Sequence, residues 1–114
     1  MSEDPDPADL FALLDDEYAR AILTETSVRP MSAKSLSETI DASLPTIYRR
    51  VEWLRDAGLV EERPAFQREG RHYGVFEARL ERIDVRLDDG ELTVSVEIEP
   101  TDPADRFTAM WEDL

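Results

Sequence analysis

The chain has 114 residues, of which 41% are hydrophobic. That is enough for one small domain with a buried core, or for one domain with a dimerising extension. It contains no cysteine, which excludes disulfides, thiolate metal sites and thiol redox sensing within the chain. No apolar run reaches the length of a membrane span and the first residues are acidic, so we expect a soluble cytoplasmic protein with no membrane attachment.

Charge is distributed unevenly along the chain. The formal net charge is −14, yet residues 44–82 hold 8 basic and 7 acidic side chains, whereas residues 1–43 and 83–114 have net charges of −7 and −8. Lys34 is the one lysine among 13 basic residues. An acidic surface with arginine in place of lysine is similar to that of proteins from salt-loving archaea, because at molar salt the Debye length is only about 3 Å and self-repulsion is tolerable. We therefore expect a halophilic protein; the alternative is a mesophilic acidic protein whose codon usage favours arginine.

The first part of the chain is predicted to form one long helix after a disordered acidic tail at residues 1–7. This helix begins at about Asp6, has Pro7 in its first turn, and continues through apolar residues at helical spacing as far as Leu23. Pro30 ends the region, because the residue before a proline is moved out of the helical conformation.

Two shorter helices are predicted next, the first of them after Ser32. Ser43 is placed to cap the following helix, which has Pro45 in its first turn and ends at Gly58. Apolar residues at positions i, i+4 and i+7 form the buried stripe of this third helix: Ile47, Val51 and Leu54.

The second half of the chain changes to strand periodicity. Residues 62–66 and 72–76 flank a turn at residues 67–70, and alternating apolar residues predict a second hairpin over 83–98 that turns at Asp88-Asp89-Gly90. A last helix is predicted after Pro103, with one apolar stripe of Phe107, Met110, Trp111 and Leu114.

Three helices followed by a hairpin are the order of a winged helix-turn-helix. The stretch SLPTIYRRVEWLRDAGLV at residues 43–60 resembles the recognition helix and the following Gly-Leu-Val junction of ArsR-like and PadR-like winged-helix regulators. The similarity continues through Glu61-Glu62-Arg63 and REGRHY at residues 68–73, and covers about residues 8–78. It implies an α+β fold, a winged helix-turn-helix domain over residues 8–78, and an extension over 79–114 that forms a dimer through its hairpin and terminal helix.

The third helix carries the side chains expected to contact double-stranded DNA. With its apolar stripe facing the core, Thr46, Arg49 and Arg50 are predicted to point away from it, and an arginine there can bind the O6 and N7 atoms of guanine. Arg68 and Arg71 flank the turn of the wing and are expected at the minor groove or its phosphates, with help from Arg63. The full set of predicted DNA contacts is Lys34, Ser43, Pro45, Thr46, Tyr48, Arg49, Arg50, Arg63, Arg68 and Arg71.

A homodimer is predicted because the terminal helix is short and isolated helices of that length are marginal in water. Pairing it with the first helix of a second copy would bury the apolar stripes of both. The predicted interface consists of Leu10, Phe11, Leu14, Phe107, Met110, Trp111 and Leu114.

These observations favour a sequence-specific transcriptional regulator over two other classes. The alternative is a winged-helix module that binds protein within the transcription machinery. An enzyme is not expected, because the sequence has no nucleophile–base pair, phosphate-binding glycine loop or metal-ligand spacing. His72 is the lone histidine and cannot form a nitrogen-rich metal site, so no metal and no cofactor are expected.

Overall fold

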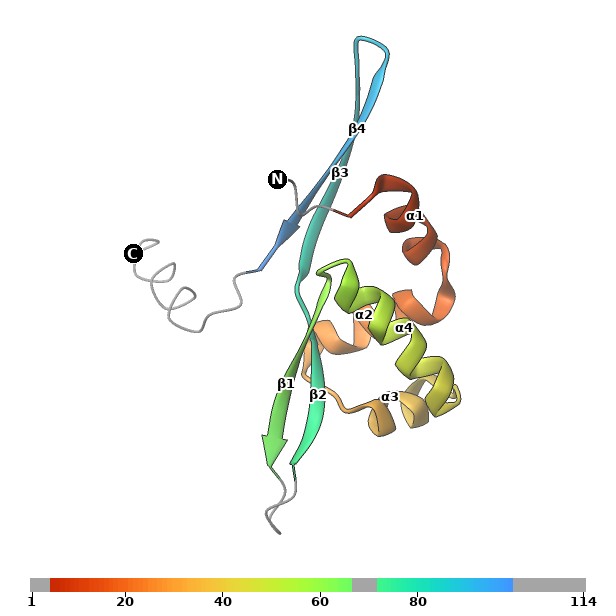
Figure 1. Cartoon of the computed structure of the whole chain (residues 1–114), viewed down its shortest axis with the longest axis vertical. Coiled ribbons are helices and arrows are strands. Elements are labelled where there is room, and N and C mark those ends of the chain that lie inside the picture. The colour runs from red at the N-terminus through yellow and green to blue at the C-terminus, as the bar shows by residue number, and fades with distance from the viewer. Residues whose placement is uncertain (1–4, 67–71, 100–114) are drawn as a thin grey trace, which may run out of the picture.

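The computed structural model describes residues 5–66 and 72–99, which form four helices followed by two β-hairpins (Figure 1). An α+β architecture is therefore confirmed. The terminal helix predicted after Pro103 and the wing residues Arg68 and Arg71 lie outside the described residues. The elements are α1 (Pro7–Asp15), α2 (Glu17–Val28), α3 (Ala33–Ile40), α4 (Leu44–Asp56), β1 (Val60–Phe66), β2 (His72–Ala78), β3 (Leu80–Asp88) and β4 (Glu91–Ile98).

The prediction of one long first helix is wrong, because the chain breaks at Asp16 into α1 and α2. Asp16 has φ −80° and ψ 123°, an extended conformation, and its carboxylate accepts a hydrogen bond from the Ala19 amide at 2.8 Å. Aspartate is a strong N-cap residue because it satisfies one of the free amides of the first turn. Apolar spacing continues across the break, so periodicity alone did not reveal it. The predicted tail over residues 1–7 is also too long, since Asp6 caps α1 and Pro7 is helical.

The two predicted shorter helices are confirmed as α3 and α4. Ser32 and Ser43 cap them by accepting hydrogen bonds from the amides of Ser35 and Thr46, at 3.1 and 3.3 Å. Helix α4 ends in a Schellman motif: Gly58 has φ +78°, its amide donates to Arg55 and the Leu59 amide donates to Leu54, both at 2.9 Å. This motif turns the chain directly from α4 into β1.

The core lies between the four helices and the inner face of the first hairpin. Its members are apolar, almost fully buried and drawn from every helix, from the connections before α3 and β1, and from β1 and β2 themselves: Leu10, Leu13, Ala19, Ile22, Leu23, Met31, Ala33, Leu36, Ile47, Val51, Leu54, Leu59, Val60, Phe76 and Ala78. Burying apolar side chains removes them from water and is the main favourable term in the folding of a domain of this size.

The first hairpin, β1–β2, is the wing and is joined to the helices by backbone hydrogen bonds. β1 and β2 pair in antiparallel register with Glu62 opposite Phe76. Phe76 also pairs with Met31 in the α2–α3 connection, with N···O distances of 2.7 and 3.0 Å. These two backbone hydrogen bonds therefore fix the position of the wing relative to the start of α3.

The second hairpin, β3–β4, has one apolar face and one polar face. The turn predicted at Asp88-Asp89-Gly90 is confirmed, with positive φ at both Asp89 and Gly90 as a two-residue hairpin loop requires. The apolar face is a ladder of three cross-strand pairs: Ile83–Val96, Val85–Val94 and Leu87–Leu92. The inner end of the ladder packs against the core, while its outer end projects past the helices (Figure 1) and leaves Leu87 76% exposed.

Within residues 5–66 and 72–99, no helix is long and apolar enough to cross a membrane.

Candidate nucleic-acid interface

Helix α4 presents an exposed surface opposite its buried stripe. Ile47 and Val51 are buried, whereas Pro45, Tyr48 and Arg49 lie in solvent. Tyr48 is 56% exposed although its ring is large and apolar. An exposed aromatic ring with a hydroxyl next to an arginine on one helix can contact both the phosphates and the base edges of a duplex.

A surface hollow connects α4 to the start of α3 and to the wing. Tyr48 lines it together with Arg29, Lys34 and Gly74 of β2. The hollow also contains one acid, Glu38. Two cations from separate elements are thus brought to the same surface as Tyr48, although they are 19 and 14 positions away in the sequence.

Arg29, Lys34 and Arg49 share a property that most other basic residues lack. They are exposed and make no ion pair with any described acid, whereas five of the ten basic residues in the described chain do. Acids outnumber bases by about two to one in the whole chain, yet none of the described acids pairs with these three cations. The positive charge of these three side chains is therefore available for an outside partner.

Arg50 does not share this surface, contrary to the expectation that it points away from the domain. Its Nε donates to the carboxylate of Asp16 at 2.9 Å, and its guanidinium lies 4.7 Å from the centroid of the Trp53 ring. Only 19% of its side chain is exposed. The break at Asp16 explains the difference, because it places an acid against α4 that a continuous helix would have carried elsewhere.

The Asp16–Arg50 pair also shifts the ionisation of the acid. Partial burial acts to raise the pKa of Asp16, but the hydrogen bond from the Ala19 amide and the neighbouring Arg50 guanidinium outweigh it and lower the pKa below its ordinary value. Asp16 therefore stays ionised, and the pair fixes α4 against the junction of α1 and α2.

The wing arginines that the structure describes are engaged with acids. Arg63, predicted to assist at the minor groove, pairs with Glu77 across the hairpin, although 40% of its side chain remains exposed. Arg79, at the end of β2, is buried and its Nη1 donates to Glu61 at 2.6 Å. Its Nε and Nη2 meet no acceptor among the described residues. Arg55, beside the wing, pairs with Glu62 at 2.9 Å.

Ser43 and Thr46 have structural partners at the start of α4. The Ser43 hydroxyl donates to the Thr46 hydroxyl at 2.9 Å while accepting from the Thr46 amide. Ser43 is exposed and Thr46 is half-buried. The cap therefore sets the orientation of the first turn, where Pro45 and Thr46 lie.

The predicted dimer interface is partly corrected. Leu10 is 0% exposed and belongs to the core of a single chain, so it has no surface to offer a partner. The interface was predicted from the apolar stripe of one continuous first helix. In the structure α1 is a separate helix, and its Leu10 side chain is buried in the core. Phe11 is 41% exposed and Leu14 is partly buried against the core. Phe107, Met110, Trp111 and Leu114 lie outside the described residues.

Sequence reasoning missed two contributors to this region. In the sequence, Arg29 is notable only because it precedes Pro30, the proline that ends a helix. Nothing in the local pattern indicates that Arg29 lines the same hollow as Lys34 and Tyr48. Trp53 was not singled out, although it supports Arg50 from the next turn of α4. Both roles depend on tertiary placement. The i, i+3 spacing of Arg50 and Trp53 was the one signal in the sequence that could have indicated a contact.

Comparison with known families agrees with this geometry. Residues 14–63 match the model of a family described as "Helix-turn-helix domain", of the ArsR type. The match contains α2, α3 and α4 and ends at Arg63 in β1, so these elements are similar to a helix-turn-helix domain. Both α1, apart from its last two residues, and the β3–β4 hairpin lie outside the matched segment. No curated protein matches the chain.

Proposed function

We propose that this protein is a sequence-specific, double-stranded-DNA-binding transcriptional regulator. The observation that carries the proposal is a group of exposed cations without a described ion pair: Arg29 and Lys34 line one hollow with Tyr48, and Arg49 follows Tyr48 on the exposed part of α4. Phosphate neutralisation by such cations supplies most of the affinity of a protein for DNA.

In the proposed complex α4 enters the major groove and the β1–β2 wing lies at the adjacent minor groove. Arg49 is the base-reading arginine, because its guanidinium has no acid partner among the described residues and can form two hydrogen bonds with guanine. Lys34 and Arg29 bind phosphates, where a point charge is sufficient. Arg50 is a positioning residue that fixes α4 through Asp16 and Trp53.

We propose that two copies act together. The exposed outer end of the β3–β4 ladder, Val85, Leu87 and Leu92, supports this, because a two-stranded hairpin is marginally stable unless its apolar face is covered. Sedimentation of Leu87→Ser would test it. A dimeric wild type and a monomeric variant are expected, and a wild type that is monomeric at working concentration would contradict the dimer.

The DNA proposal is tested by selecting duplexes from a random pool with the full chain. Arg49→Gln and Arg86→Gln are selected in parallel, and the second is a matched control because Arg86 is an exposed arginine of β3 without a described ion pair. We expect the wild type and Arg86→Gln to enrich the same sequence and Arg49→Gln to enrich none. Absence of enrichment by the wild type would instead favour the protein-binding alternative.

A further inference from the structure

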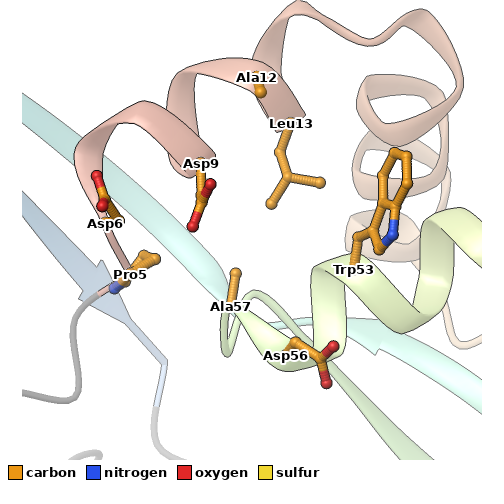
Figure 2. A pocket seen from close by; sticks show the side chains of 8 residues that line it. All are labelled: Pro5, Asp6, Asp9, Ala12, Leu13, Trp53, Asp56 and Ala57. Atoms are coloured by element: carbon orange, nitrogen blue, oxygen red, sulfur yellow. The ribbon is translucent and has the colours of Figure 1, made fainter.

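A second hollow lies between α1 and the end of α4, away from the proposed DNA-binding surface (Figure 2). It has a volume of about 430 Å³, within the range of sites that hold small organic molecules. Ala12, Leu13 and Ala57 supply apolar walls, and the Trp53 ring stands at one end. Trp53 is 46% exposed, so much of its surface is not covered by the rest of the domain.

Three carboxylates surround this apolar space: Asp6, Asp9 and Asp56. No described cation forms an ion pair with any of them. Asp56 is the last residue of α4, where the carbonyl ends of the helix already carry partial negative charge and a carboxylate is unfavourable. Its neighbour Arg55 is directed to Glu62 instead. The rim of the hollow is therefore electrostatically complementary to a cation.

We propose that this hollow binds an organic cation with an apolar body, such as an aryl ammonium or phosphonium ion. The apolar walls favour the body of the ligand, and the three carboxylates favour its charge. One face of the Trp53 indole stacks on the Arg50 guanidinium at 4.7 Å, and the opposite electron-rich face can contribute to binding the ligand cation. A simple metal ion would not use the apolar walls, and a neutral or anionic molecule would not use the carboxylates.

This hollow shares no lining residue with the hollow beside Tyr48, so the proposal survives failure of the proposed function and is tested by itself. Tetraphenylphosphonium is titrated into the full chain by calorimetry in sodium chloride buffer, with tetraphenylborate as an anion of the same shape. We expect saturable one-to-one binding of the phosphonium and no binding of the borate. Binding of both ions alike, or of neither, overturns the proposal.

Two variant pairs locate the site. Asp56→Asn should weaken phosphonium binding about fivefold, whereas Asp15→Asn, which removes an exposed carboxylate from the last residue of α1, should change it less than twofold. Ala12→Trp fills the hollow without changing charge and should abolish binding, while Ala8→Trp, on the exposed surface of the same helix, should not.

Circular dichroism shows which variants are folded and fit for comparison. Equal loss of affinity in Asp56→Asn and Asp15→Asn would mean that only overall charge matters, and would overturn the site. If a second copy of the chain covers the hollow instead, the phosphonium will not bind and Ala12→Trp will alter sedimentation, which also overturns it.

Discussion

The two sides of α4 show opposite uses of arginine. Arg49 is exposed and has no ion pair within the described chain, whereas the adjacent Arg50 is four-fifths buried between Asp16 and the Trp53 ring. A step of one residue along the helix, about 100° around its axis, separates the unpaired guanidinium of Arg49 from the ion-paired guanidinium of Arg50. In an acidic chain, a cation is available to a partner only where the fold keeps acids away from it, so placement matters more than the number of arginines.

The largest effect on stability among the charged residues of α4 is expected at Arg50. Arg50→Ala should lower the free energy of unfolding by about 1–2 kcal/mol, because it leaves the partly buried Asp16 carboxylate without its charged partner. Chemical denaturation measures this. Arg55→Ala is the control, since its pair with Glu62 is about half exposed and should contribute less than about 1 kcal/mol. Equal losses of unfolding free energy in Arg50→Ala and Arg55→Ala would show that the partly buried ion pair of Arg50 stabilises the fold no more than an exposed ion pair does.

The N-cap of α4 tests the exposed side of the helix separately, because the Ser43 cap orients the first turn, where the exposed residues begin. Ser43→Ala should cost about 1 kcal/mol, the typical effect of losing an N-cap hydroxyl. Ser35→Ala, an exposed serine inside α3, should stay within about 0.5 kcal/mol of the wild type. Thermal unfolding of both variants measures the difference, and a neutral Ser43→Ala would show that the cap is not needed.

A smaller effect is expected from the charge of Asp16 alone. The folded protein lowers the pKa of Asp16, so its ionised form contributes stability above the ordinary value of about 3.9, and this contribution is lost as the pH falls below that value. Asparagine keeps the cap but not the charge. Asp16→Asn should therefore be less stable than the wild type at pH 6, with a gap that narrows at pH values below about 4.

The control for this pH dependence is Asp15→Asn, which changes an exposed neighbour with no described ion pair. It should follow the wild type at both pH values. If the difference in unfolding free energy between Asp16→Asn and the wild type is the same at both pH values, the charge of Asp16 does not contribute to stability.

Salt should have a weak effect on DNA binding. Each phosphate neutralised contributes a slope of about −0.9 to the dependence of affinity on salt, so phosphate contacts by Arg29, Lys34, Arg68 and Arg71 predict a slope no steeper than about −4 per subunit. Screening of the acidic surface opposes even this loss and can reverse it. Affinity for the selected duplex between 0.1 and 2 M potassium chloride, a range of about twentyfold in ionic strength, measures the slope. A steep decrease like that of a basic repressor would contradict the role of the acidic surface.

Helix α4 was predictable from the sequence because local signals determine it. Ser43, Pro45 and Gly58 define its ends, and Ile47, Val51 and Leu54 define its buried side. The loop between α1 and α2 was not predictable from periodicity, because the apolar stripe continues through Asp16 and only the capping preference of aspartate opposes it.

The site was predictable in part. Arg49 follows from the helical stripe, since a residue two positions after Ile47 lies far from the buried side. The same reasoning failed for Arg50, whose partner Asp16 is 34 positions away. Leu10 was assigned to an interface because it lies on the apolar stripe of the first helix, and periodicity does not show which part of such a stripe the core of a single chain covers.

The central claim is tested most directly by the affinity of Arg49→Ala, Arg50→Ala and Arg86→Ala for the selected duplex, measured by fluorescence anisotropy where all three are folded. Arg49→Ala should lose about 1–3 kcal/mol of binding free energy with unchanged stability, the usual value of a two-pronged arginine–guanine contact. Arg86→Ala should bind as the wild type does, and Arg50→Ala should show a deficit mainly in stability. Wild-type affinity in Arg49→Ala, with the loss found in Arg50→Ala instead, would contradict the account.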